Sequence, residues 1–315
     1  MSKIKAAIAC KNPDTIQYVY GTERLELLKE LTDLNPVMMT EKNAADGSFA
    51  DTEVIFSSWG MPGLTGEQLE KLPALKAVFY AAGTTDYFKG PFLKKGILVS
   101  SAWKANAIPV AEFTFAQIIL SLKNYFTVSA AVKATKQWYG QNVGRGTYGA
   151  TVALIGAGAI SKRVQEMLKS VDVNVIVIPS RAENRTISLE EAFRTAQIVS
   201  NHLPDRDDNV GVFHAGLFES MPENAVFINT GRGRQVREDD LIAVLKKRPD
   251  LSALLDVTYP EPPVPGSELY TMPNIHLSPH IAGSMNDEVK RMADVEIEEF
   301  KRYRDGLPLE NLVEV

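Results

Sequence analysis

Short apolar runs alternate with helical patterns along nearly the whole chain. In the first hundred residues, β-branched or apolar runs predict strands at 5–9, 54–57, 77–80 and 97–100. Helical spacing at 23–31 and 66–71 lies between them, and Thr65 is a suitable N-cap for the second of these helices. Strands that alternate with helices favour a parallel sheet, so this region is expected to form a small α/β unit.

The pattern changes near residue 105. Residues 107–122 are apolar on almost every side of a helix, and Pro109 falls where a first helical turn tolerates proline. A helix that is apolar all round must be buried, either between domains or against another subunit. The sequence does not decide between these two positions. Burial against another subunit would make the helix a dimer contact. No continuous apolar run reaches the ~18 residues that a membrane span requires, so no membrane partner is expected.

The strand–helix alternation then resumes and continues almost to the C-terminus. Apolar runs predict further strands at 151–155, 173–178, 198–200, 226–229, 253–257 and 275–277. Residues 286–303 read as an amphipathic helix that returns to the first domain. The fold class is therefore α/β, with two doubly wound parallel-sheet domains. One domain comprises 1–100 and 286–315, and the other is inserted at 101–285.

Composition and charge narrow the classes of function. A chain of 315 residues with a formal net charge of -5 favours two soluble domains and argues against a general nucleic-acid binder. The one dense basic run, Lys246-Lys247-Arg248, is better explained as a complement to a helix dipole. Cys10 is the single cysteine, so no intramolecular disulfide forms. The N-terminal apolar stretch is too short for a signal peptide, and a cytoplasmic protein is expected.

The strand at 151–155 ends directly in Gly156-Ala157-Gly158, and a helical pattern follows. In such a turn Gly156 allows the sharp bend and Gly158 lets a pyrophosphate approach the backbone. The N–H groups that open the helix, at Ala159 and Ile160, would stabilise its negative charge. Ser161 stands where the fingerprint has a third glycine, and serine is small enough to fit there.

The end of the next strand bears on cofactor choice. NAD-selective sites place an Asp or Glu ~20 residues after the glycines to bind the ribose 2′-hydroxyl. Here Pro179 occupies that position, and Ser180 and Arg181 follow, with Arg185 close behind. Guanidinium groups suit a 2′-phosphate, so NADP(H) is the preferred cofactor. The alternative is that Arg181 is only solvated and that NAD(H) also binds.

Three polar residues lie just past predicted strands of the second domain. Arg232 follows 226–229, Glu261 follows 253–257 and His280 follows 275–277. Carboxyl ends of parallel strands share one sheet edge, so all three can meet one ligand. Arg offers a planar fork to a carboxylate, His exchanges protons near neutral pH, and a carboxylate beside the ring orients it. Taken singly, the three could be a surface ion pair, a loop acid and a turn residue.

With these residues, the sequence strongly resembles the D-isomer-specific 2-hydroxyacid dehydrogenase family. The resemblance is most specific at 229–233, 256–262 and 278–283. The resemblance implies a flavodoxin-like substrate domain and a Rossmann dinucleotide-binding domain. It implies that Arg232 holds the substrate's carboxylate and carbonyl oxygen. It also implies that His280 protonates that oxygen as hydride reaches C2, and that Glu261 pairs with His280.

Further roles follow from the same resemblance. Asp256 would contact the nicotinamide amide, and three residues would line the cofactor, namely His202, Pro204 and Thr230. Backbone N–H groups of a first-domain loop would bind the substrate carboxylate at Ala82, Gly83 and Thr84. The sequence departs from the family's pattern at Ser161, Pro179 and Arg237. Arg237 stands where an acid or Asn is common after the catalytic Arg.

The expected function is hydride transfer between NAD(P)H and a small 2-oxo acid, giving the D-2-hydroxy acid by family resemblance, in a homodimer. Two alternatives stay open. One is a cofactor-sensing interaction protein, like the family's corepressor relatives. The other is a nucleotide-binding transferase, in which Arg232, Glu261 and His280 would have no shared role. A metal site is not expected. His276 and His280 have a metal-ligand spacing only if helical, and Pro279 with the strand pattern before it disfavours a helix.

Overall fold

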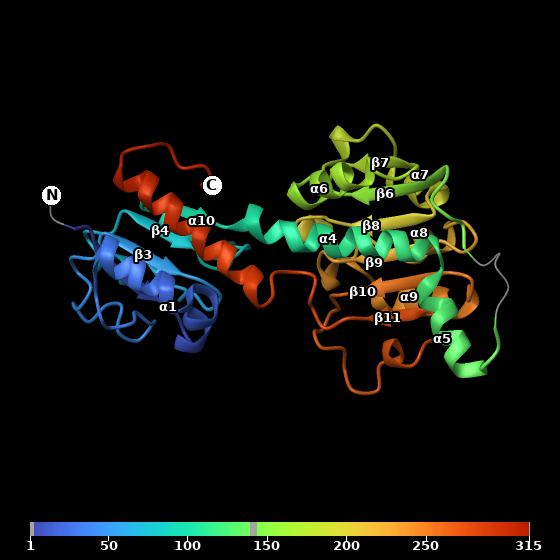
Figure 1. Ribbon diagram of the computed structural model, residues 1–315, viewed down its shortest axis with the longest axis horizontal. Helices are drawn as coiled ribbons and strands as arrows, with labels where there is room; N and C mark the ends of the chain where they lie inside the picture. The colour runs from blue at the N-terminus through green and yellow to red at the C-terminus, as the bar shows by residue number, and fades with distance from the viewer. Residues whose placement is uncertain (1–2, 139–143, 315) are drawn as a thin grey trace. The chain divides into compact units, whose positions relative to one another are not determined.

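The computed structural model describes residues 3–138 and 144–314, and the chain divides into two compact units. Unit 1 comprises Met1–Ala107 and Ser284–Val315, and unit 2 comprises Ile108–Gly283. Each unit is built on an all-parallel sheet with helices on both faces (Figure 1). The predicted fold class, α/β with two doubly wound parallel sheets, is confirmed.

Unit 1 has five strands in the order β2-β1-β3-β4-β5. The strands are β1 (Lys5–Ala9), β2 (Asp33–Leu34), β3 (Val54–Ser57), β4 (Ala77–Tyr80) and β5 (Leu98–Ser101). The helices are α1 (Pro13–Leu31), α2 (Gly66–Glu70), α3 (Lys89–Lys94) and α10 (Asp287–Arg304). This strand order is that of flavodoxin-like folds.

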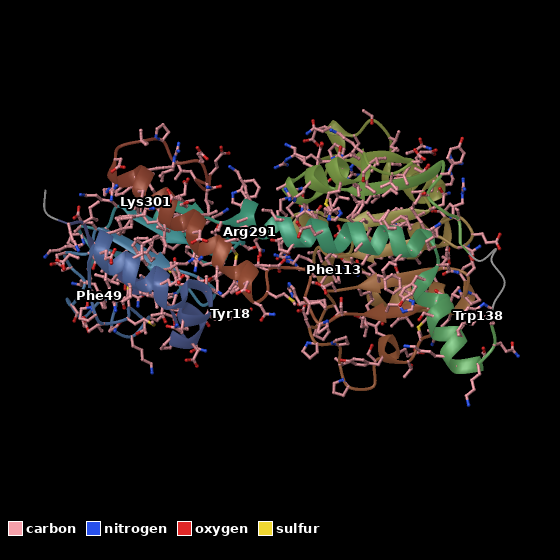
Figure 2. All side chains as sticks on the ribbon, in the orientation of Figure 1. Tyr18, Phe49, Phe113, Trp138, Arg291 and Lys301 are labelled. Atoms are coloured by element: carbon pink, nitrogen blue, oxygen red, sulfur yellow. The ribbon has the colours of Figure 1, made fainter. Side chains whose placement is uncertain are left out.

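Side chains of the unit 1 strands alternate between two cores. Phe56 and Phe79 share a core with α1 and α10, where Phe300 packs edge-on against both rings. Ile55 belongs to a second core on the opposite face. This core contains Phe49, which is labelled in Figure 2. Both faces of the sheet are therefore covered, which is why β3 and β4 are continuous apolar runs.

Unit 2 has six strands in the order β11-β10-β9-β8-β6-β7. They are β6 (Ala150–Ile155), β7 (Val173–Ile178), β8 (Ile198–Asn201), β9 (Val226–Asn229), β10 (Ser252–Leu255) and β11 (Ile275–Leu277). The α-helices are α4 (Trp103–Leu122), which begins in unit 1, α5 (Tyr125–Thr135), α6 (Ala159–Leu168), α7 (Leu189–Thr195), α8 (Ala215–Glu219) and α9 (Glu238–Lys247). Short 3₁₀ helices lie at η1 (Ala182–Asn184), η2 (Asp207–Asn209), η3 (Gly233–Gln235) and η4 (Glu268–Tyr270).

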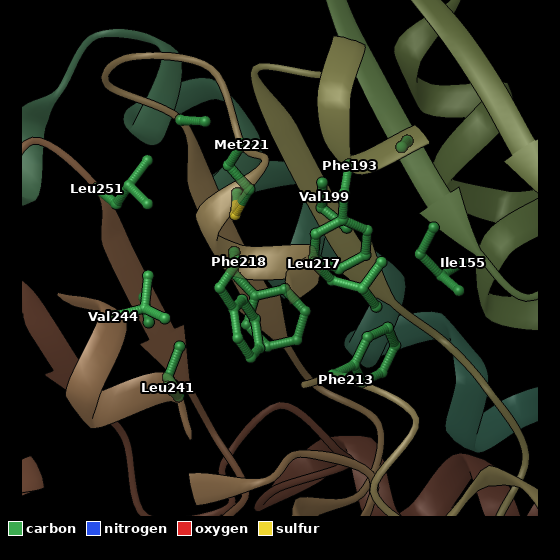
Figure 3. Close-up of a cluster of buried hydrophobic side chains, with 14 of the residues drawn as sticks. Ile155, Phe193, Val199, Phe213, Leu217, Phe218, Met221, Leu241, Val244 and Leu251 are labelled. Atoms are coloured by element: carbon green, nitrogen blue, oxygen red, sulfur yellow. The ribbon is translucent and has the colours of Figure 1, made fainter. Parts of the chain in front are cut away.

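Two cores enclose the unit 2 sheet. One contains aromatic side chains from α7, α8 and β9 and extends to α9, and Figure 3 shows part of it. The other packs α4 and α6 on the opposite face. The sheet ends at β7 on one side, and the chain then returns through η1 and α7 to place β8 on the other side of β6. The chain therefore reverses its direction of strand addition between β6 and β8, which is where ligands of open α/β sheets bind.

Several sequence expectations need correction. Helix α4 starts at Trp103, so Pro109 lies inside it and not in its first turn. Packing of α4 on the sheet supports the helix across the missing N–H. Strand β10 ends at Leu255, two residues before the expected end, and the sequence did not predict β2 or α5.

Helix α4 also bears on the membrane expectation. It is long and apolar enough to span a bilayer by length and composition, although its apolar residues do not form one continuous run. However, 56% of the apolar 18-residue stretch of this helix is buried inside the protein. This apolar helix is therefore mostly part of a core.

Candidate active site

The carboxyl ends of all six unit 2 strands lie along one edge of the sheet. The register pairs Ile178 with Ile155, Ile155 with Asn201, and Asn201 with Asn229. Asn229 in turn pairs with Leu255, and Leu255 with Leu277. The site residues predicted in unit 2 thus follow strand ends that share this edge. Parallel strands are spaced about 4.8 Å apart, so β7 and β9 lie roughly 14 Å apart along it.

Gly156 makes the turn after β6 with a φ of 115°, which L side chains rarely adopt. Its N–H donates to the Ile178 carbonyl at 2.7 Å. A Cβ at this position would overlap the backbone carbonyl of His202, so glycine is needed for the close approach of two strand-end loops. Gly158 is the N-cap of α6, has no side-chain cap, and faces open space at its Cα. This cradle and its uncapped helix N-terminus fit a pyrophosphate.

The departure at Ser161 is accommodated locally. Its side chain is buried on α6, where the Gln165 amide nitrogen lies 3.5 Å from the Ser161 hydroxyl. The position that other dinucleotide turns give to a third glycine therefore holds a small polar side chain that has a hydrogen-bond partner.

Three arginines surround the end of β7. Arg185 donates to the Pro179 and Ser180 carbonyls, both at 2.9 Å, so it braces the strand end. Arg181 is exposed. Arg206, which the sequence interpretation missed, lies 3.4 Å from the Ser180 hydroxyl and makes a two-pronged ion pair with Asp208.

This ion pair sets the local charge. The Arg206 guanidinium holds the pKa of the Asp208 carboxyl below its usual value, and Arg181 contributes in the same direction. The side chains of Arg181, Arg185 and Arg206 outnumber the nearby acids Glu183 and Asp208, so the net charge beside Ser180 is positive, which suits a phosphate monoester.

The loop after β8 is buried and neutral. Burial lowers the pKa of His202 to about 4, so its ring is uncharged near neutral pH. Its Nε2 lies 3.0 Å from the Ser200 hydroxyl, and within the described parts of the chain its Nδ1 has no hydrogen-bond partner. A buried polar atom without a partner beside the glycine turn fits a site that a cofactor completes.

Arg232 lies in a loop that buried amides hold in place. The Asn201 amide donates to Asn229 at 2.8 Å and to Gln235 at 2.7 Å, and the Gln235 amide donates to the Pro204 carbonyl at 2.8 Å. The three amide side chains are fully buried. They lock the loops after β8 and β9 together, because breaking one bond would leave buried polar groups unpaired.

Gly233 completes this packing, since a Cβ there would overlap the backbone of Thr258. The Thr230 hydroxyl lies 3.1 Å from that of Thr114 on α4. The backbone on both sides of Arg232 is therefore constrained.

His280 and Glu261 form a direct pair. His280 Nδ1 lies 2.6 Å from Glu261 Oε1, and their side chains are 53% and 41% exposed. His280 has a left-handed backbone with a φ of 54°. Such a conformation costs energy in a non-glycine residue, and it is held here by surrounding contacts.

Asp256 provides those contacts. It is buried, and its carboxylate accepts from the Ser278 hydroxyl at 2.5 Å and from the Ile281 and Ala282 N–H groups, both at 2.9 Å. The His280 N–H donates to the Asp256 carbonyl at 2.9 Å. Asp256 therefore positions the His280 loop, a role that the sequence interpretation did not foresee. Its predicted contact to the nicotinamide amide stays a prediction.

His276 lies apart from this chemistry. It sits on strand β11 with its ring centroid 5.5 Å from that of Phe126, and burial lowers its pKa. Within residues 3–138 and 144–314, no group of three or more His, Cys, Asp or Glu side chains is placed to hold a metal ion.

The predicted substrate loop belongs to unit 1. It follows β4, and the Ser101 hydroxyl donates to the carbonyls of Ala82 and Gly83 at 2.9 and 2.6 Å. Ala82 is buried and Thr84 is exposed. The part that Ala82, Gly83 and Thr84 play in substrate binding stays a prediction.

Comparison with known proteins places this geometry in a family. The profile of the D-isomer specific 2-hydroxyacid dehydrogenase NAD binding domain matches residues 115–282. The chain is 31% identical over 210 residues to the putative 2-hydroxyacid dehydrogenase YoaD of Bacillus subtilis, covering 61% of this chain and 59% of YoaD. It is 29% identical to a glyoxylate reductase of Aeropyrum pernix, covering 69% of this chain and 70% of that protein. The chain spans less than two-thirds of the length of the first curated relatives that it matches.

A solved structure shares the fold. It is described as a probable 2-hydroxyacid dehydrogenase from Rhizobium etli in complex with NADP, HEPES and L(+)-tartaric acid. The TM-score is 0.77 at 20% identity, and the match covers 99% of this chain and 98% of that one. The profile match takes in Gly156, Arg232, Glu261 and His280, and the chain belongs to the D-isomer specific 2-hydroxyacid dehydrogenase family.

Proposed function

We propose that the protein reduces a small 2-oxo acid to the 2-hydroxy acid with a nicotinamide cofactor, and that Arg232, Glu261 and His280 carry the reaction. The observation that supports this most is the 2.6 Å pair between His280 and Glu261, one strand away from the Arg232 loop on the edge that also bears the Gly156 turn. A binding protein would not need a carboxylate-held histidine there.

In this mechanism Arg232 binds the substrate carboxylate through its guanidinium fork and polarises the carbonyl oxygen. Glu261 Oε1 accepts a hydrogen bond from the Nδ1–H of His280 and stabilises the charged ring, so that Nε2 carries the proton for the substrate oxygen. The cofactor, when bound, supplies the hydride to C2. His280 then leaves the step neutral and is reprotonated from solvent, to which its side chain is 53% exposed.

The direct test is His280→Ala. Loss of a general acid lowers kcat by roughly 10²–10⁴-fold, while the Kd for NADPH should stay near the wild-type value. His214→Ala is a matched control, because His214 is the N-cap residue of α8 and is not among the residues proposed to bind the cofactor or the substrate. Retention of more than about a tenth of kcat would contradict the role of His280 as proton donor. Absence of NAD(P)H consumption in the wild type with glyoxylate, hydroxypyruvate and pyruvate would favour the interaction protein.

We further propose that NADP(H) is the preferred cofactor, that Ser180 and Arg181 bind its 2′-phosphate, and that Arg206 joins them by exchanging its ion pair with Asp208 for this phosphate. The positive cluster beside Ser180 and the absence of an acid at Pro179 support this, and the Rhizobium etli relative was solved with NADP. Arg181→Ala and Arg206→Ala should each raise KM for NADPH roughly tenfold, the worth of one hydrogen bond to a charged group, and leave KM for NADH nearly unchanged. Arg194→Ala on α7 is the control. Equal effects on both cofactors would contradict the assignment.

We propose that the loop at Ala82, Gly83 and Thr84 completes the substrate site and that the product is the D-isomer. Chiral chromatography of the hydroxy acid formed from hydroxypyruvate and pyruvate tests the stereochemistry. An L-product would overturn it.

Family membership and the free, buried Cys10 favour a cytoplasmic protein.

We also propose a homodimer. Helix α5 has the sequence YFTVSAAVKAT, yet none of its residues is buried. Tyr125 at its start is 52% exposed, and Trp138, just past its end, is 94% exposed (Figure 2). Exposed apolar helices with aromatic residues are typical of interfaces between subunits.

A further inference from the structure

Two arginines share one carboxylate in the loop that carries Arg232. Arg234 Nε donates to Asp205 Oδ1 at 2.6 Å, and Arg232 Nε lies 3.5 Å from Asp205 Oδ2. Each oxygen of Asp205 is thus engaged by a different guanidinium, and the contact to Arg234 is much the closer. Arg234 also reaches Asp207 at 3.1 Å, but Asp207 is 97% exposed, so Asp205 is its principal partner.

The surroundings keep this arrangement in place. Asp205 follows Pro204 in the loop after β8, and both arginines follow β9, its neighbour in the sheet. The buried amide of Gln235, next to Arg234, donates to the Pro204 carbonyl at 2.8 Å. The side chains of Asp205, Arg232 and Arg234 are about one-third exposed, at 31, 37 and 32%. Their distances are therefore set by two loops that cannot separate easily.

A carboxylate beside Arg232 competes with the carboxylate of a substrate. Both are anions that pair with the same planar fork, and a close Asp–Arg pair would have to be broken before a 2-oxo acid could bind. At 3.5 Å, with its other oxygen occupied, Asp205 orients Arg232 without forming the shorter pair that it forms with Arg234.

We infer that Arg234 is a positioning residue for substrate binding: it holds Asp205 by the closer contact and so limits the competition of Asp205 with the carboxylate of the 2-oxo acid for the Arg232 guanidinium. The inference rests on the proposed function, in which Arg232 binds that carboxylate. Arg234 acts through Asp205 and need not touch the substrate. The direction of the pKa of Arg234, raised first by the Asp205 hydrogen bond and then by Asp207, agrees with this pairing.

The test is a double-mutant cycle measured with saturating NADPH and glyoxylate or hydroxypyruvate. In Arg234→Ala, Asp205 loses its close partner and pairs with Arg232, so KM should rise about fivefold or more, the worth of a partly exposed ion pair. The kcat should change by less than about twofold, because the His280–Glu261 pair is untouched. Adding Asp205→Asn removes the competitor, and KM should return to within about twofold of the wild type.

Controls separate positioning from damage to the fold. Arg237→Ala removes an exposed arginine whose side chain donates to the Gly211 carbonyl at 3.0 Å, and it should leave KM unchanged. Arg234→Lys keeps a cation beside Asp205 and should stay close to the wild type, which retains a test if Arg234→Ala does not fold. An unchanged KM in Arg234→Ala, or a double variant as impaired as Arg234→Ala, would overturn the inference.

Failure of the proposed function would look different. If Arg232→Ala leaves KM for both 2-oxo acids unchanged, Arg232 does not bind the carboxylate and the proposed function fails at that residue. If Arg232→Ala raises KM but Arg234→Ala does not, only the role of Arg234 fails.

Discussion

The most quantitative prediction concerns Glu296, a carboxyl group inside the core of unit 1. Glu296 lies on α10 and is fully buried. Burial raises the pKa of Glu296 well above the usual 4.5. The Ser100 hydroxyl and the Tyr80 backbone oppose this shift, whereas the charge of Glu299 adds to it. The folded protein therefore holds Glu296 protonated under conditions in which the unfolded chain ionises it.

The sign and size of the effect follow from this difference. Below pH 4.5 both states are protonated, so Glu296 costs nothing. As pH rises above that value the unfolded state releases its proton, and unit 1 loses stability by about 1.4 kcal/mol per pH unit until the folded pKa is reached. Between pH 5.5 and 7.5 this amounts to as much as ~2.7 kcal/mol. Glu296→Gln has the same shape and no charge in either state, so it should remove this loss.

Urea unfolding followed by circular dichroism, from pH 4.5 to 7.5, measures the effect. The free energy of unfolding of Glu296→Gln minus that of the wild type should increase with pH, and hydrogen exchange in the α10 peptide should show the same trend. Glu298→Gln, on the same helix with a side chain 66% exposed, is the matched control and should show no such trend. A difference that stays constant from pH 5 to 7.5 would refute the reasoning, because Glu296 would then be ionised in the folded protein.

Three further predictions concern the site and the surface. Gly156→Ala should weaken NADPH binding at least tenfold in a fluorescence titration, because its Cβ would overlap the His202 carbonyl and its φ of 115° disfavours a side chain; unchanged binding would argue against the turn as the cofactor cradle. Asp256→Ala leaves the buried N–H groups of the His280 loop without acceptors, at about 1–3 kcal/mol each, so both Tm and kcat should fall, and an unaltered kcat would exclude the bracing role. Trp138→Ser should shift the protein toward monomer in light scattering after size exclusion, and a wild type that is already monomeric would exclude the proposed interface.

Much of the fold follows from local patterns in the sequence. Strands such as β3 and β4 are buried on both faces, so they are continuous apolar runs with clear ends. The two-residue strand β2 has no such run, and α5 has no buried residue, which is why neither was predicted. The start of α4 was misplaced because Pro109 looked like a first-turn residue, whereas packing on the sheet maintains the helix around it.

The chemistry of the site was also largely legible in the sequence. Each of the residues Gly156, Arg232, Glu261 and His280 lies within six residues of the end of the preceding strand, and carboxyl ends of parallel strands share an edge whatever the order of the strands. The sequence by itself therefore determined which chemical groups gather at that edge.

Only the tertiary structure decided which groups touch. The pairs Asp205–Arg234 and Asn201–Gln235 join loops that become neighbours because β8 lies beside β9. Asp256 accepts hydrogen bonds from the His280 loop because β10 lies beside β11, a role that its predicted contact to the nicotinamide amide did not include. These contacts depend on strand order and on side-chain directions across the sheet. Neither property is encoded in the local periodicity, which is set by the burial of each segment on its own.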